Sequence, residues 1–347
     1  MVGYTIEALP KVVLHDHLDG GLRASTVLDL AREVGYEGLP ARDAGSLEAW
    51  FHQAGAASLA QYLEAFRHTF GVMQTPEAMA RVAYEAVADL AADGVVYAEM
   101  RFAPSLHLSR GMSRSEAIAG VLEGLTRGEA EFGMTARVIV DAMRQDTDSE
   151  EVVAAALGFV GRGVVGFDLA GPEAGFPASG HSCALRAAAE GGLHITIHAG
   201  EGAGVESIAD ALACGAERLG HGVRIVEDLD EDGRPGPVAG EVLERRIALE
   251  VCPTSNLDTK IYARPKDHPL GRLHRSGFVV TINTDNRLMS ATSPSRELAF
   301  AVERQGMSLG DLETITMAAI DAAFCDEDTR QQVRLRVADG YRGVEAI

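Results

Sequence analysis

Short runs of β-branched and other apolar residues alternate with longer segments rich in alanine and leucine along nearly the whole chain. Such short runs are typical of buried strands, whereas the longer segments are typical of helices. Helices are expected at 113–132, 148–161, 178–191 and 205–214, the second with an N-cap and acidic first turn from Asp148, Ser149 and Glu150. The pattern predicts eight strands, at 12–17, 95–102, 137–141, 164–169, 195–198, 217–221, 248–251 and 279–284.

This alternation of strand and helix predicts a fold class. It favours parallel strands joined by crossover helices, and eight such units close naturally into a (β/α)8 TIM barrel. A doubly wound open sheet is the alternative architecture. Residues 24–93 are too many for one crossover, so we expect a helical insertion after the first strand. No linker or low-complexity tract divides the chain, and we expect a single domain spanning residues 1–347.

Composition and charge exclude several kinds of partner. The 51 acidic and 31 basic residues give a formal net charge of −20. That field repels nucleic acid and anionic membrane surfaces, so we expect neither as a partner, although it serves solubility equally well. The four cysteines form no CxxC pair, and no signal peptide or membrane-length apolar run is evident. A cytoplasmic protein acting on a neutral or cationic small molecule is expected.

The first predicted strand ends in His15-Asp16-His17. Side chains two apart on a strand share a face, so His15 and His17 project together and can chelate one metal ion. The alternative is a pair of hydrogen-bonded histidines without a metal. Asp16 points to the opposite face, and we expect it to make a structural contact behind the site.

Further metal-binding residue types stand at the ends of other predicted strands. His198 ends the fifth, His221 the sixth and Asp285 the eighth. Strands one and eight are neighbours in a closed barrel but not in an open sheet, so the barrel brings Asp285 to His15 and His17. Imidazoles with one carboxylate suit zinc, and iron, cobalt or manganese also fit. Spacing leaves His221 either as a fourth imidazole ligand or as a general base.

Glu201 follows three residues after His198, where a carboxyl group can shuttle protons beside a metal site. The alternative is a glutamate that interacts with the dipole of the next helix. The surrounding sequence Gly200-Glu201-Gly202-Ala203-Gly204 is similar to a dinucleotide-binding loop. Val205 occupies the place of the third glycine, so the fingerprint fails and nicotinamide binding is not expected.

Six segments occur in this order along the chain: Pro10-Lys11-Val12-Val13-Leu14-His15-Asp16-His17-Leu18-Asp19-Gly20, Gly166-Phe167-Asp168-Leu169-Ala170-Gly171, His198-Ala199-Gly200-Glu201, Leu219-Gly220-His221-Gly222, Cys252-Pro253-Thr254-Ser255-Asn256 and Asn283-Thr284-Asp285. Together they resemble the adenosine deaminase family, and the resemblance runs from about residue 8 to about residue 325. It implies a (β/α)8 barrel with one zinc ion per chain that acts on a purine nucleoside.

The resemblance also implies roles for individual residues. Glu201 would protonate N1 of the purine, and His221 would orient and deprotonate the attacking water. The metal ligands would be His15, His17, His198 and Asp285. Substrate contacts would come from Asp19 to the ribose 5′-hydroxyl, from the Gly171 N–H to N3, and from Asn286 and His17. An apolar helical lid would contain Leu59, Tyr62, Leu63 and Phe66, although their spacing is also that of any core-facing helix.

One position departs from the family pattern. The family commonly has a second aspartate after the metal ligand, which binds purine N7, and proline next; this chain has Asn286 and Arg287. N7 is an acceptor, so a carboxyl group must be protonated to donate to it, whereas an amide donates at any pH. Asn286 therefore either keeps the contact or signals a changed substrate.

The leading hypothesis is a zinc-dependent deaminase of purine salvage, which converts adenosine and 2′-deoxyadenosine to inosine and 2′-deoxyinosine with release of ammonia. Adenine or 6-amino-6-deoxyfutalosine is the alternative substrate. A hypothesis of another class is a catalytically silent binding relative, which would lack a metal ligand or Glu201; this chain has all of them. It lacks the PCxxC pair of deaminases that act on nucleic-acid bases.

Overall fold

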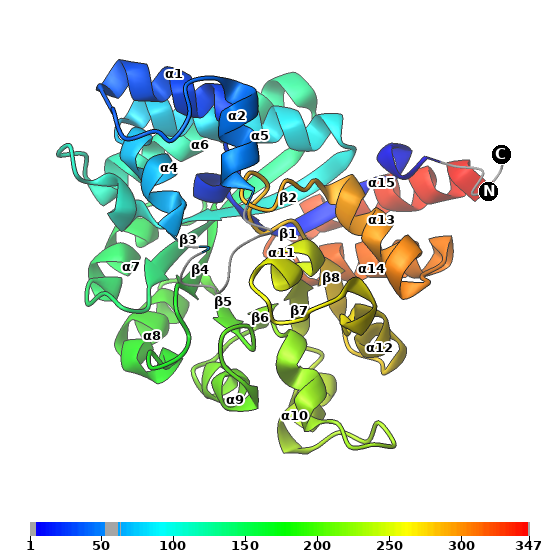
Figure 1. Cartoon of the computed structure of the whole chain (residues 1–347). Helices are drawn as coiled ribbons and strands as arrows, with labels where there is room; N and C mark the ends of the chain where they lie inside the picture. The colour runs from blue at the N-terminus through cyan, green and yellow to red at the C-terminus, as the bar shows by residue number, and fades with distance from the viewer. Residues whose placement is uncertain (1–4, 53–61, 63, 346–347) are drawn as a thin grey trace.

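The computed structural model describes residues 5–52, 62 and 64–345. Eight parallel strands form one sheet in which each strand pairs with the next along the chain, and helices surround it (Figure 1). This confirms the predicted (β/α)8 barrel. The strands are β1 (Lys11–His17), β2 (Val95–Phe102), β3 (Thr135–Met143), β4 (Val164–Ala170), β5 (His194–Ala199), β6 (Arg218–His221), β7 (Ala248–Val251) and β8 (Val280–Ile282).

Contacts between β1 and the residues after β8 bring the two ends of the sheet together. The Asn283 side-chain oxygen accepts hydrogen bonds from the N–H groups of Leu14 (2.7 Å) and His15 (3.2 Å). The His17 N–H donates to the Asp285 carbonyl at 2.8 Å, and the Asp285 N–H donates to the His15 carbonyl at 3.0 Å. The first and last strands therefore meet, as the barrel hypothesis requires and the open sheet forbids.

Asp16 lies behind this seam, on the opposite side of β1 from the two histidines. Its Oδ2 accepts hydrogen bonds from Thr284 Oγ1 and Arg287 Nε, both at 2.7 Å. The expected structural contact is confirmed, and Arg287 is one of its two donors.

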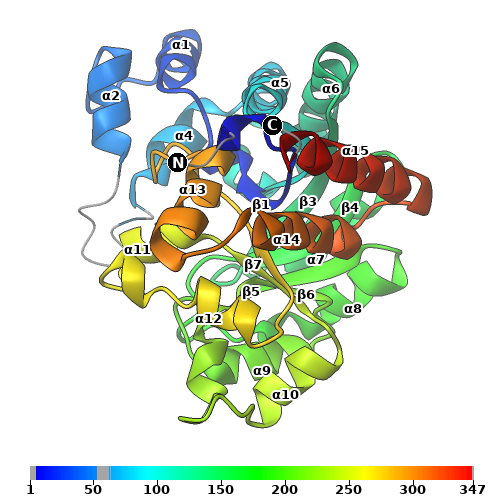
Figure 2. The same cartoon turned by 90° about the vertical axis from the view of Figure 1, so that its right-hand side faces the viewer.

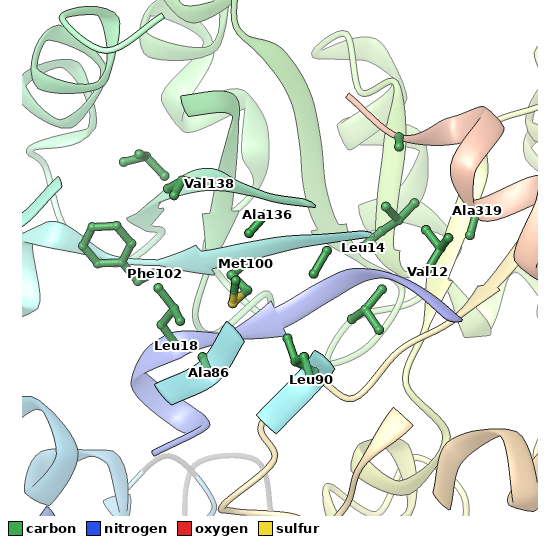
Figure 3. Packing of buried hydrophobic residues seen from close by; sticks show 14 of the residues in the cluster. Val12, Leu14, Leu18, Ala86, Leu90, Met100, Phe102, Ala136, Val138 and Ala319 are labelled. Carbon is green, nitrogen blue, oxygen red and sulfur yellow. The ribbon is translucent and has the colours of Figure 1, made fainter. Parts of the chain in front are cut away.

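Apolar side chains on the outer face of the strands pack against the surrounding helices. Figure 3 shows Val12 and Leu14 of β1 in one cluster with Leu90 of α5 (Pro76–Ala92) and Ala319 of α14 (Leu309–Ala322). Neighbouring residues of a strand face opposite ways, so the same strand that presents Leu14 to the helices turns His15 into the barrel. Burial of the outer face thus fixes which residues reach the lumen.

The lumen itself is strongly polar, unlike the branched apolar layers that usually fill such barrels. Arg101 donates to Asp168 at 2.8 Å and to Glu250 at 2.7 Å. Arg218 donates to the other Glu250 oxygen at 2.7 Å and to Glu99 at 2.6 Å. All five side chains are fully buried. Buried charges are tolerated when each has a partner, so this network forms a rigid floor beneath the mouth of the barrel.

The helical insertion predicted between the first two strands is present in the described residues. Its helices α1 and α2 lie together outside the ring of crossover helices (Figures 1 and 2). The insertion contains α1 (Ala24–Val34), α2 (Ala44–Phe51), α4 (Phe66–Val72) and α5 (Pro76–Ala92). The later helices are α6 (Arg114–Phe132), α7 (Ser149–Leu157), α8 (Ser182–Glu190), α9 (Val205–Ala213), α10 (Pro237–Glu244), α11 (Pro253–Asp258), α12 (Leu270–Arg275), α13 (Pro294–Gln305), α14 (Leu309–Ala322) and α15 (Glu327–Glu345).

Three predictions about helices need correction. The helix expected at 148–161 ends at Leu157, because glycines follow and two of them, Gly161 and Gly163, have positive φ. Asp148 occupies the N-cap position, but its carboxylate accepts hydrogen bonds from Ser105 and Arg114 instead of capping the helix. The helix expected at 178–191 begins as a 3-10 turn, and α8 starts only at residue 182.

Among the described residues, no helix is both long enough and apolar enough to cross a membrane.

Candidate active site

A cavity opens at the carboxyl ends of the strands, where a barrel of this kind carries its functional groups. His17 from the end of β1, Gly171 from the end of β4, His198 from β5 and His221 from the end of β6 contribute to its lining. Its empty space, including open solvent at the mouth, is about 590 Å³. The mixed apolar and polar lining suits a small organic molecule.

Three histidines and one aspartate converge at the floor of this cavity. Ligand atoms of His15, His17, His198 and Asp285 all lie within 4.8 Å of one another. Asp285 Oδ1 is 3.4 Å from the Nε2 atoms of both His15 and His17, and the Nε2 atoms of His17 and His198 are 3.4 Å apart. His15 Nε2 is buried and has no hydrogen-bond partner among the described residues.

This arrangement fits a bound cation. Two Nε2 atoms that face each other cannot both carry a proton, and an unpartnered buried nitrogen is costly. One divalent ion at the centre would satisfy all four donors, and N₃O sets of this kind suit zinc. His221 is not a member of the group, although its ring centroid lies 4.9 Å from that of His15.

Each of three members of this group contacts a partner that holds it in place from outside. Glu250 Oε2 lies 2.9 Å from His15 Nδ1, and Asp168 Oδ2 lies 2.8 Å from His198 Nδ1. A carboxylate that accepts a hydrogen bond from Nδ1, as Glu250 does from His15, keeps the proton there and leaves Nε2 free for a metal. Ser255 donates a hydrogen bond to Asp285 Oδ2 at 2.6 Å. Sequence reasoning gave these partners no role, although a charged residue inside an apolar strand was a usable signal for two of them.

The backbone is left-handed at two residues of the site. His221 has φ 59° and Asp285 has φ 57°, a region that residues other than glycine rarely adopt. Such conformations cost roughly 1–3 kcal/mol each and persist where the surrounding structure requires them. Here each turns a side chain from the end of its strand into the cavity.

Glu201 and His221 face each other beside the histidine cluster. Glu201 Oε2 lies 3.5 Å from His221 Nε2, and both residues are buried. Burial raises the pKa of Glu201 well above its usual range, and the nearby charges of Asp285 and Glu173 raise it further. Burial lowers the pKa of His221 well below its usual value, although the Asp285 carboxylate opposes that shift. A protonated carboxyl group beside a neutral imidazole suits proton transfer to a substrate.

A chain of hydrogen bonds fixes which nitrogen of His221 carries the proton. The Leu270 N–H donates to Nδ1 of His268 (3.2 Å), so the His268 Nε2–H donates to Oδ1 of Asn256 (3.2 Å). The amide nitrogen of Asn256 then donates to Nδ1 of His221 at 3.1 Å. The proton of the neutral His221 ring is therefore on Nε2, toward Glu201.

The residues expected to contact substrate line the same cavity. Asp19, Gly171 and Asn286 all do so, and Gly171 has φ 94°, which favours glycine. Of the four expected lid residues, Tyr62 and Phe66 also line the cavity, and Leu59 and Leu63 lie outside the described residues.

The structure adds cavity residues that the sequence analysis did not single out. Asp141 and Met143 of β3 and Thr259 after α11 also line the cavity. Asp141 Oδ2 lies 3.5 Å from Nδ1 of His17. A charged residue in the apolar run of β3 was a signal for Asp141, whereas nothing in the local sequence distinguishes Thr259.

Comparison with known proteins agrees with this geometry. Residues 10–340 match the family model described as adenosine deaminase. The chain is 52% identical over 336 residues to the adenosine deaminase of Mycobacterium leprae, covering 94% of this chain and 93% of that one. It superposes on the adenine deaminase of Arthrobacter aurescens with a TM-score of 0.87 at 26% identity (96% and 99% of the chains). An amidohydrolase from Burkholderia ambifaria, solved with bound zinc, gives a TM-score of 0.87 at 25% identity (98% and 93%). The chain therefore belongs to the adenosine deaminase family.

Proposed function

We propose that this protein catalyses the hydrolytic deamination of adenosine and 2′-deoxyadenosine to inosine and 2′-deoxyinosine, with release of ammonia. The observation that carries the proposal is the cluster of His15, His17, His198 and Asp285 directly beside the Glu201–His221 pair in one cavity. A binding protein without catalysis would not need a proton donor next to a set of metal ligands. The name of the mycobacterial relative supports adenosine as the substrate.

The metal we propose for the cluster is zinc. Three neutral imidazoles and one carboxylate form a donor set that zinc favours, and iron, cobalt and manganese are the other ions that the set suits. When bound, the ion supplies hydroxide at neutral pH by lowering the pKa of water towards ~7.

Glu201 makes the purine ring electrophilic. C6 of adenine is a poor electrophile, and a proton delivered to N1 breaks the ring's aromaticity. The raised pKa of Glu201 keeps its carboxyl group protonated and able to donate. Hydroxide then adds to C6, and the proton of the added hydroxyl group is transferred to the amino group. The C–N bond breaks with release of ammonia, and the purine keeps the oxygen at C6 and the proton at N1.

His221 orients the attacking oxygen. Because its ring is neutral and carries its proton on Nε2, it donates a hydrogen bond from that atom and has no free lone pair there. We therefore assign it the orienting role alone, without the removal of a proton from water that the family resemblance implied.

Substrate contacts complete the proposal. The Gly171 N–H donates to N3, Asp19 accepts from the 5′-hydroxyl with His17 beside it, and the Asn286 amide donates to N7. We propose that Tyr62 and Phe66 belong to a lid over the ribose and that the insertion at 24–93 forms this lid. We also propose that the insertion and the barrel are one domain. Both residues line the cavity, which supports this placement.

A panel of 6-aminopurines tests the substrate. Adenosine and 2′-deoxyadenosine are expected to be converted fastest, because the cavity offers Asp19 to a sugar hydroxyl. Adenine and 6-amino-6-deoxyfutalosine are compared at equal concentration, with products identified by chromatography and ammonia measured separately. Faster conversion of free adenine than of adenosine would contradict the proposal.

Replacement of Asn286 tests the contact to N7. With 7-deazaadenosine, which has CH in place of N7, the wild-type kcat/KM should fall by about 10-fold or more, because one hydrogen bond in a buried site is lost. Asn286→Ala should lower kcat/KM for adenosine by a similar factor. The variant should then no longer discriminate between adenosine and 7-deazaadenosine. If the variant still discriminates between them as strongly as the wild type, Asn286 does not bind N7.

A further inference from the structure

The glycine-rich loop at residues 200–204, which resembles a dinucleotide-binding motif, binds the side-chain carboxylate of Glu173 from the same chain. Four consecutive N–H groups, at residues 200–203, donate to the carboxylate of Glu173. Oε1 accepts from Glu201 (2.8 Å) and Gly202 (3.0 Å), and Oε2 accepts from Gly200 (3.0 Å) and Ala203 (3.2 Å). A carboxylate has about four lone-pair sites, so this one is fully used.

The loop is shaped for this contact. Successive N–H groups that point into one concavity form an anion-binding nest. Gly200 has φ 75°, a conformation that favours glycine, and a Cβ there would come within 2.6 Å of Ile208 Cδ1 and displace that side chain. Glu173 is buried, and the nest is therefore closed to an external phosphate.

The same loop carries Glu201. Its backbone N–H makes the shortest of the four bonds, and its side chain lines the cavity and faces His221. The Glu201 side chain has three rotatable bonds, so the place of its carboxyl group depends on a fixed backbone. A displacement of about 1 Å at a reacting group can cost ~10²-fold in rate. Glu173 itself is not among the residues that line the cavity.

We propose that Glu173 is a positioning residue for Glu201: its carboxylate holds the 200–203 backbone so that the Glu201 carboxyl group reaches the substrate. The inference rests on the proposed function, since it requires Glu201 to be the proton donor. This role explains the glycine-rich loop. It also explains why the buried Glu173 carboxylate contacts neither the histidine–aspartate cluster nor the cavity.

Glu173→Gln tests the proposal because the amide keeps the size of the side chain but presents an NH₂ group to N–H donors. We expect kcat for adenosine to fall by about 10²-fold with little change in KM, since ground-state contacts to the substrate are untouched. Metal content, measured by elemental analysis, should stay at the wild-type value. In the Glu201→Gln background the same change should cost less than about 3-fold, because Glu173 acts through Glu201.

Glu206→Gln is the matched control: Glu206 accepts a hydrogen bond from Gly204 in the same loop, and its side chain lies outside the cavity lining. It should keep near-wild-type kcat. If Glu173→Gln fails to fold, Glu173→Asp replaces it, because aspartate keeps both carboxylate oxygens on a shorter side chain. We then expect a smaller loss of kcat and the same non-additivity with Glu201→Gln. Wild-type kcat in a folded Glu173 variant, or a full loss repeated on top of Glu201→Gln, would overturn the inference. Absence of adenosine deamination by the wild type would instead refute the proposed function.

Discussion

Protein stripped of its metal by a chelator is expected to lose adenosine deamination by at least ~10³-fold, and added zinc is expected to restore it. When bound by His15, His17, His198 and Asp285, the ion would help to supply the nucleophile and would contribute several kcal/mol of charge stabilisation, where each 1.36 kcal/mol corresponds to tenfold in rate. Metal content is measured by elemental analysis in the purified, stripped and reloaded protein. The purified protein should contain about one zinc per chain.

Two histidines on β5 supply a matched pair of variants for this experiment. His198→Asn removes a member of the cluster and should reduce both metal content and activity. His194→Asn changes the half-exposed residue at the start of the same strand, which pairs with Glu217 and lies outside the cluster. It should keep both. Full activity in protein verified to be metal-free would refute the metal-dependent mechanism.

Glu201→Gln is expected to lower kcat/KM by about 10²–10⁴-fold, the usual contribution of a general acid. Metal content should not change, because Glu201 is not a member of the metal cluster. The wild-type group donates only when protonated, so kcat/KM falls as pH rises through the pKa of Glu201. Burial raises that pKa well above the usual range, with Asp285 and Glu173 adding to the rise, so the proton is retained into the pH range where an ordinary glutamate is ionised.

The pH profile separates proton donation from a structural role. An amide does not titrate, so the Glu201 contribution to the alkaline limb should be absent from the profile of the Gln variant. The Glu206→Gln control should keep that limb with near-wild-type rates. A Glu201→Gln protein with full activity, or with an unchanged alkaline limb, would show that Glu201 does not protonate N1.

The strands show how far local pattern reaches. The predicted bounds of 95–102 and 248–251 are those of β2 and β7, although charged residues interrupt both mainly apolar runs, among them Arg101 in β2 and Glu250 in β7. The strand expected at 279–284 is shorter, ending at Ile282. There the Asn283 side chain takes over the pairing with β1, and Asp285 adopts its left-handed turn. Contacts across the seam decided that end, and they join residues nearly 270 positions apart.

The cavity residues likewise divide into those that the local sequence predicts and those that only tertiary contacts bring into place. His15, His17, His198 and Asp285 were found because each stands at the carboxyl end of a strand, which a local pattern reveals. Their outer partners depend on register between neighbouring strands: Asp168 meets His198 because β4 lies beside β5. The contact between the Glu173 carboxylate and the glycine-rich loop also cannot be predicted from the loop motif. The loop sequence is the same whether the anion that it binds is a ligand or a side chain.

The sequence by itself determined the eight strands, the barrel, the residue types of the histidine–aspartate cluster and the family, because side-chain period and position at strand ends are local properties. Tertiary structure alone decided the closed seam, the polar network under the cavity, the proton on Nε2 of His221 and the link from Glu173 to Glu201. Each of these is a hydrogen bond or ion pair between distant parts of the chain. Its partner is chosen by barrel register and closure, which no local pattern contains.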